Sequence, residues 1–253
     1  MEVLKASDVP VSSIVESWAI SASWAPMIFI FTTYLFLVLK VGPKFMETRK
    51  PFQLTNFTRV YNILQVILCT VFVTWALKFG LKIDTFWKCL SDFNDREKLL
   101  EYKIAQWWFL HLRLAELIET VVFVLRKKQN QVSLLHVYHH ISTATIIWMF
   151  MKYCSTIMDL HTAFVNSFVH IFMYFYYFLS SYKSLDKYTK KAKPFITGLQ
   201  LIQLVIILGQ NVAAILPSCH VTRLFYVQAI NAAILIYFFA DFYIQSYVKK
   251  KQK

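Results

Sequence analysis

The sequence predicts an all-α membrane protein with seven transmembrane helices. Of its 253 residues, 57% are hydrophobic, which is more than the roughly 45–50% typical of a soluble domain. Its apolar runs reach the ~17–25 residues that a membrane span needs. Positive charge alternates between the short loops, as is typical of a polytopic membrane protein. We expect the spans at about 24–41, 60–79, 104–125, 132–150, 159–181, 195–216 and 224–247.

These spans account for most of the chain. Seven helices of ~20 residues use ~140 residues, so residues 1–253 are expected to form a single polytopic membrane domain. Ionisable side chains within a span are costly and usually face a bundle interior. We therefore expect the third segment to span the membrane with its polar groups turned inward. These groups are His111, Arg113, Glu116 and Glu119.

The charges of the loops predict the orientation. Lys and Arg outnumber Asp and Glu by three or four in 42–59, 126–131, 182–194 and 248–253, and by at most one in the other loops. Basic loops stay in the cytosol, so the N-terminus is expected in the lumen and the C-terminus in the cytosol. The net charge of +13 is divided among these short clusters, which argues against a nucleic-acid partner.

This topology predicts which cysteines lie in the membrane and which face the lumen. Cys69 lies within a span, whereas Cys89, Cys154 and Cys219 fall on the lumenal side, where disulfides can persist. Three thiols allow three pairs. We predict the Cys89–Cys219 bridge, which would tie two lumenal loops together.

Both ends of the chain bear on its location. The first 24 residues lack the basic start and apolar core of a cleavable signal peptide. Lys250 and Lys251 stand four and three residues from the C-terminus, like the dilysine signal that retrieves membrane proteins to the endoplasmic reticulum. The tail, residues 248–253, therefore predicts an endoplasmic-reticulum membrane protein.

Three histidines open the fourth span. His136, His139 and His140 stand at positions i, i+3 and i+4, so a helix places all three imidazoles on one face. A single His in an apolar helix can be a packing residue, but three need three polar partners. Because ionisable groups inside a span are functional candidates, we interpret this box as a candidate functional site.

Polar residues of the third to seventh spans lie at similar depths. Helix rise places His139 ~12 Å and His170 ~18 Å from the cytosolic ends of their spans. Asn166 precedes His170 by one turn, on the face that also carries Tyr174 and Tyr177. The lumenal halves are mostly apolar and aromatic. This pattern predicts a polar chamber open to the cytosol and continued by an apolar tunnel. Further polar residues at this level are Glu116, Glu119, Gln200, Gln203 and Asp241.

With these residues in place, the chain resembles the fatty-acid elongase family over nearly its whole length. The family's HxxHH box is His136 to His140, and its NxxxHxxMYxYY element is Asn166 to Tyr177. Its TxxQxxQ element is Thr197 to Gln203. The KxxExxDT element departs twice, with Arg113 in place of Lys and Glu119 in place of Asp. Arg is a planar fork rather than a point charge, so its contacts can differ from those of Lys.

The resemblance implies an enzyme that condenses a long-chain acyl-CoA with malonyl-CoA, with six of the seven helices around an acyl tunnel. It implies no cofactor, a membrane-lipid environment and other enzymes of the elongation cycle as partners. Carried over, His139 is the nucleophile that forms an acyl-imidazole, a competent covalent intermediate, and His170 is its partner. His136, His140 and Asn166 would orient the imidazoles and stabilise negative charge.

CoA would approach from the cytosol, where basic residues at helix ends can pair with its phosphates. Below them, polar residues would line the path of the pantetheine arm. The expected substrate-binding residues are Arg113, Glu116, Glu119, Arg126, Lys128, Gln131, Tyr174, Tyr176, Tyr177, Lys193, Thr197, Gln200, Gln203 and Gln245.

Two alternatives have different chemistry. A di-iron membrane desaturase or hydroxylase also carries His boxes, but two irons need many imidazole ligands. Seven histidines and one box are too few, so no metal is expected. A non-enzymatic seven-helix receptor shares the topology but gives no reason for three aligned imidazoles. Metal content and the activity of His139→Ala separate these alternatives from the elongase.

Overall fold

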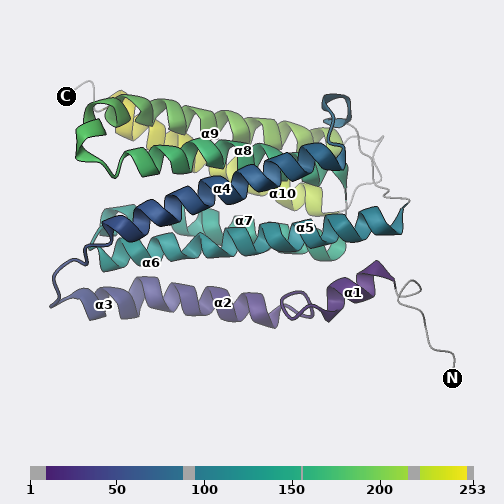
Figure 1. Ribbon diagram of the computed structural model, residues 1–253, viewed down its shortest axis with the longest axis horizontal. Coiled ribbons are helices and arrows are strands. Elements are labelled where there is room, and N and C mark those ends of the chain that lie inside the picture. Colours follow the sequence, from purple (N-terminus) through teal and green to yellow (C-terminus); the bar gives the residue numbers. More distant parts are fainter. Residues whose placement is uncertain (1–9, 88–94, 155, 216–222, 250–253) are drawn as a thin grey trace. The chain divides into compact units, whose positions relative to one another are not determined.

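The computed structural model describes residues 10–87, 95–154, 156–215 and 223–249, and this part of the chain is helical without a strand (Figure 1). It forms two compact units. The first unit comprises Met1–Phe52 and Asp92–Ser155, and the second comprises Gln53–Ser91 and Thr156–Lys253. The expected all-α fold is confirmed. The partners of the expected disulfide, Cys89 and Cys219, and the tail residues Lys250 and Lys251 lie outside the described residues.

The first unit is built on long helices from two separate parts of the chain. α5 packs along α7, and α3 packs against α6 (Figure 1). Two apolar clusters hold it together, one around Trp148 and one around Tyr34. Its helices are α1 (Val11–Ser17), α2 (Ala25–Phe36), α3 (Gly42–Met46), α5 (Arg96–Ala115), α6 (Leu117–Leu125) and α7 (Leu134–Tyr153).

The close packing of α3 and α6 depends on a glycine. A Cβ atom on Gly42 would lie 2.7 Å from the Leu37 carbonyl oxygen and 2.7 Å from Val124 Cγ1. A five-residue π-helical segment, Leu37–Val41, joins α2 to α3 just before this point. Only glycine permits the backbone of α3 to begin so near α6.

Local signals in the sequence set the start and end of the helix that carries the His box. The Ser133 hydroxyl accepts a hydrogen bond from the His136 backbone N–H at 3.2 Å, which is a typical N-cap. At the other end, the buried Lys103 ammonium donates to the carbonyls of Phe150, Met151 and Cys154. A cation is favourable there because the C-terminal carbonyls of a helix carry partial negative charge. α7 is therefore fixed at both ends.

The described residues of the second unit form four long helices. α4 packs along α8, α8 packs against α9, and α9 packs against α10 (Figure 1). The α4 helix ends at Gly80, whose φ of 111° lies in the left-handed region, where a glycine C-cap is favoured. The elements are α4 (Thr55–Phe79), α8 (Ile157–Leu179), α9 (Asp186–Ile215) and α10 (Arg223–Tyr243), which continues as a π-helical segment, Ile244–Val248.

Among the described residues, five helical segments are long and apolar enough to cross a bilayer, which indicates a multi-pass membrane protein. The expected third and fourth spans fall on α5–α6 and α7, which are outside this set of five. The third segment is interrupted at Glu116, between the end of α5 and the start of α6. The five segments are Ala25–Met46, Thr55–Phe79, Ile157–Leu179, Lys183–Ile215 and Arg223–Val248.

Candidate active site

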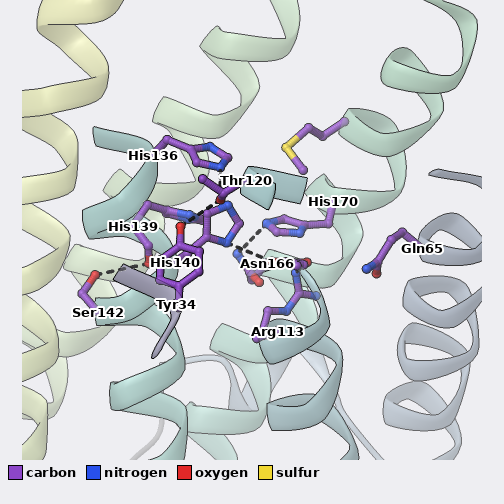
Figure 2. Close-up of polar contacts among 12 residues, drawn as sticks. Tyr34, Gln65, Arg113, Thr120, His136, His139, His140, Ser142, Asn166 and His170 are labelled. Carbon is purple, nitrogen blue, oxygen red and sulfur yellow. Dashed lines mark hydrogen bonds and ion pairs between the residues drawn. The ribbon is translucent and has the colours of Figure 1, made fainter. Parts of the chain in front are cut away.

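The three imidazoles of the His box lie together near the start of α7. The ring centroid of His140 is 4.4 Å from that of His136 and 5.2 Å from that of His139, both in edge-to-face arrangements. His140 is buried, whereas the other two are half-buried. Figure 2 shows the three rings in one group. The helical spacing therefore produces a compact cluster of titratable nitrogens.

Two hydrogen bonds in series hold the ring of His136. The Thr120 hydroxyl of α6 is 3.0 Å from His136 Nε2 and 2.8 Å from the Tyr34 hydroxyl of α2 (Figure 2). Thr120 and Tyr34 are both buried. This pair of hydrogen bonds links α2, α6 and α7 of the first unit. His136 Nε2 thus has a protein partner that fixes the ring's orientation.

A buried ion pair lies beside the third ring. Arg113 Nη1 donates to Glu116 Oε1, and Glu116 Oε2 is 3.8 Å from His140 Nδ1. The side chains of Arg113 and Glu116 are only 2% and 1% exposed. The guanidinium also lies over the Phe109 ring, with Cζ 4.8 Å from its centroid. A buried charge needs a partner, and Glu116 is the partner of the Arg113 guanidinium. Its other oxygen faces His140, so the carboxylate links the ion pair to the His box.

Within the described part of the first unit, one group of donor atoms could hold a metal ion. Glu119, His136 and His140 each offer a ligand atom, and these atoms lie within 4.8 Å of one another. Imidazole and carboxylate suit zinc or iron, although His136 Nε2 already has the Thr120 hydroxyl as a partner. Three donors are too few for a di-iron centre. The expectation of a metal-free enzyme stays a prediction.

The second unit carries its own histidine on α8. The Asn166 side-chain amide donates to His170 Nε2 at 3.4 Å, one helical turn away (Figure 2). An acceptor at Nε2 leaves the ring proton on Nδ1. The ring of His170 is 5.7 Å from that of Tyr174, which in turn is 5.9 Å from that of Tyr177. The face expected from helical spacing thus brings four polar side chains into one row.

The remaining expected residues of the second unit make contacts within it. Gln200 Nε2 is 3.2 Å from Met173 Sδ, which joins α9 to α8. The Thr197 hydroxyl is 3.3 Å from the Tyr247 hydroxyl. Gln203 is buried, whereas Gln245 is exposed and donates to both carboxylate oxygens of Asp241 at 3.0 Å.

Basic residues follow the end of α6, which closes the third expected span. Burial and the neighbouring Arg126 lower the pKa of Lys128 from its usual value. Lys127 between them adopts a positive φ of 54° and donates to the Glu47 carbonyl at 3.2 Å. Two adjacent cations would both be stabilised by a bound anion. Gln131 in the same loop and Lys193 of the second unit are exposed.

Four buried polar residues were not expected as site residues. Thr120 stands at the end of the KxxExxDT element, which was the available signal. Tyr34 lies in an apolar run without any pattern, so only the fold reveals its contact. Asn62 and Gln65 are buried on α4, and their i, i+3 spacing was the signal that could have found them.

The two units thus define a polytopic membrane protein whose helices bury imidazoles, amides and an ion pair. The chain belongs to the ELO family, described as the GNS1/SUR4 family, whose model matches residues 19–253. This confirms the resemblance found from the motifs.

Curated relatives match along nearly the whole chain. Very long chain fatty acid elongase 4 of Homo sapiens is 34% identical over 241 residues, covering 94% of this chain and 76% of the relative. Very long chain fatty acid elongase 1 of Mus musculus is 34% identical over 242 residues, covering 94% and 87%. Very long chain fatty acid elongase 5 of Bos taurus is 33% identical over 238 residues, covering 93% and 79%.

Proposed function

We propose that this chain is the condensing enzyme of fatty-acid elongation. It joins a long-chain acyl-CoA to malonyl-CoA and yields a 3-oxoacyl-CoA two carbons longer, CO2 and CoA. Fatty-acid elongation is the activity named in its relatives, and membership of their family carries it to this chain. The observation in the structure that best supports it is the imidazole cluster beside a buried carboxylate.

The first chemical step is acyl transfer to His139. A ring nitrogen attacks the thioester carbonyl carbon, the carbon–sulfur bond breaks, and CoA leaves with the proton of the ring. Neutral imidazole is a competent nucleophile that forms covalent intermediates. Nothing but the imidazole and the two CoA thioesters is needed, so the enzyme works without a cofactor.

The second step forms the new carbon–carbon bond. Malonyl-CoA loses CO2, and the resulting enolate carbon attacks the acyl carbon held on His139. The carbon–nitrogen bond breaks, and the ring regains a proton from solvent. We assign His170, with Asn166 at its Nε2, as the partner that stabilises developing negative charge, because hydrogen-bond donors at such charges are strong contributors to catalysis.

The neighbouring groups position the nucleophile. Glu116 is held by Arg113 and faces His140, while Thr120 holds His136. Both neighbours of the nucleophile in the box are therefore oriented by buried partners. Arg113 and Glu116 support the imidazoles in this proposal as well as lining the path of the substrate.

CoA binding uses the cytosolic ends of the helices. Arg126, Lys128 and Lys193 pair with the phosphates, and the lowered pKa of Lys128 beside Arg126 is consistent with an anion site. The polar side chains below them take the pantetheine arm. This set is Gln131, Glu119, Tyr174, Tyr176, Tyr177, Thr197, Gln200, Gln203 and Gln245.

The membrane arrangement completes the proposal. Seven spans cross the endoplasmic-reticulum membrane, six of them around an acyl tunnel, with the N-terminus in the lumen and the C-terminus in the cytosol. Lys250 and Lys251 act as the retrieval signal, and Cys89 pairs with Cys219 in the lumen. The other enzymes of the elongation cycle are its expected protein partners.

An elongation assay tests the function. Purified protein is incubated with a long-chain acyl-CoA and malonyl-CoA labelled at C2, and the products are separated by chain length. We expect a labelled 3-oxoacyl-CoA from the wild type and from His111→Asn, a histidine variant outside the proposed machinery, but none from His139→Ala. A wild type that binds both thioesters and forms no product would overturn the proposal and favour a receptor.

A further inference from the structure

The α4 helix buries two amide side chains on the face that it turns toward its own unit. Asn62 and Gln65 are both 2% exposed and stand one turn apart. The opposite face is apolar and exposed at Val60, Leu64 and Ile67. Further along the buried face the residues become small and apolar, at Cys69 and Ala76. The polar part of α4 is thus confined to its first half.

The contacts of α4 with α8 give the level of these amides. Arg59 Nε donates to the Ser181 hydroxyl at 2.9 Å. The Tyr61 ring is 6.1 Å from the Tyr174 ring. The two helices therefore run antiparallel, and the residues after Tyr61 lie level with those before Tyr174. This is the stretch of α8 that carries His170.

The close-up agrees with this register. Figure 2 shows Gln65 reaching from its helix toward the side on which His170 and Asn166 lie. All three residues belong to the second unit. Gln65 thus reaches toward a histidine to which the proposed function gives a catalytic role, and Asn62 precedes it by one turn on the same buried face.

Each amide keeps one polar atom without a hydrogen bond among the described residues. The Gln65 side-chain N–H donates to the Tyr61 hydroxyl at 3.1 Å, which fixes the amide and leaves Oε1 as a buried acceptor. The buried Nδ2 of Asn62 is a donor for which the described residues supply no acceptor. Leaving such groups unpaired costs free energy. Polar residues of membrane helices usually bond to a neighbouring helix, but within the described part of the chain these two atoms make no such bond.

We propose that Asn62 and Gln65 bind a secondary amide of the pantetheine arm of CoA. This inference rests on the proposed function, which brings CoA thioesters to His170. A secondary amide offers one carbonyl acceptor and one N–H donor, which match Asn62 Nδ2 and Gln65 Oε1. A thioester carbonyl would leave the Gln65 acceptor unmatched, and a carboxylate would be repelled by it. Among the CoA groups that offer both a donor and an acceptor, a pantetheine amide lies nearest the thioester that must reach His170.

The test compares two inhibitors that differ only in this amide. One is a long-chain S-alkyl N-acetylcysteamine thioether, which keeps the amide next to the thioester position but cannot react. The other replaces the amide by a methylene chain of equal length. We expect the wild type to bind the amide inhibitor about tenfold more tightly, the factor that about 1.4 kcal/mol gives. The preference should fall to near one in the double variant Asn62→Leu/Gln65→Met.

Two further measurements separate binding from folding. The double variant should unfold within a few degrees of the wild type, because removing two unpaired buried atoms offsets the loss of the hydrogen bond from Gln65 to Tyr61. Thr58→Val is the matched control on α4, since the Thr58 hydroxyl donates within its own helix to Leu54, and it should keep the tenfold preference. A preference that survives in the double variant, or is absent from the wild type, overturns this inference. A wild type that makes no 3-oxoacyl-CoA overturns the proposed function instead.

Discussion

Glu116 faces His140 across 3.8 Å, with its second carboxylate oxygen bonded to Arg113. The residue also marks the point where α5 ends and α6 begins. A break in the helix and a buried ion pair thus coincide beside the His box. Sequence spacing predicted a charged helix face here, and the structure shows that the charges pair with one another.

Removing one partner of this ion pair should destabilise the protein more than removing both. Glu116→Leu removes the carboxylate that pairs with the buried Arg113 cation, and breaking a buried ion pair typically costs about 3–5 kcal/mol. Arg113→Met/Glu116→Leu removes both charges and should recover most of that loss. Denaturant unfolding in detergent measures this difference. Equal stability of the single and double variants would show that the pair is not held as described.

Removing the Thr120 and Tyr34 hydroxyls that lead to His136 should lower the elongation rate more than it lowers the stability of the protein. Thr120→Val keeps the shape of the side chain but removes the bonds to His136 and Tyr34. We expect the elongation rate to fall about fivefold to tenfold, since one hydrogen bond contributes about 1 kcal/mol. Tyr34→Phe should have a smaller effect. Both residues act on His136 through the Thr120 hydroxyl, so the double variant should be no slower than Thr120→Val. If the losses of rate in the two single variants added up in the double variant, Tyr34 and Thr120 would not act on His136 in series.

Lys103 should stabilise the protein by capping the C-terminal end of α7. Lys103→Met leaves the carbonyls of Phe150, Met151 and Cys154 without their cationic donor. We expect a loss of about 2 kcal/mol in unfolding free energy, since hydrogen bonds to charged groups contribute about 1.5–3 kcal/mol. Lys152→Met is the control, because Lys152 donates to Ser21 at 2.8 Å from a more exposed position. The two variants should differ, and equal losses would argue against a capping role.

Elongation should not depend on a bound metal. His136 Nε2 is already occupied by the Thr120 hydroxyl, and the proposed chemistry needs only imidazoles. Incubation with EDTA followed by gel filtration should leave the rate unchanged. Elemental analysis of the active protein should find less than one zinc or iron per chain. A stoichiometric metal whose removal abolishes activity would assign Glu119, His136 and His140 as ligands instead.

The sequence predicted the features that depend on local spacing. The His box forms a cluster because i, i+3 and i+4 positions meet on any helix, and Asn166 reaches His170 for the same reason. The long apolar segments became helices because a bilayer-length apolar run has few alternatives. Family motifs supplied the elongase relationship, which the comparisons confirm.

Contacts between distant segments could not be predicted from spacing. Tyr34 meets Thr120 across 86 positions, and no periodicity in an apolar run reveals which tyrosine will do so. The interruption at Glu116 also escaped the sequence, because the third segment reads as one continuous run. The i, i+3 spacing of Asn62 and Gln65 puts them on one face of α4, but only the packing of α4 along α8 shows that this face is buried.

The most direct test of the central claim is intact-protein mass spectrometry after incubation with a long-chain acyl-CoA and no malonyl-CoA. The acyl-imidazole mechanism predicts a mass gain equal to one acyl group in the wild type, absent in His139→Ala and released when malonyl-CoA is added. No adduct in a wild type that condenses normally with malonyl-CoA would contradict the mechanism. His139 would then act as a base or an orienting group on a bound thioester.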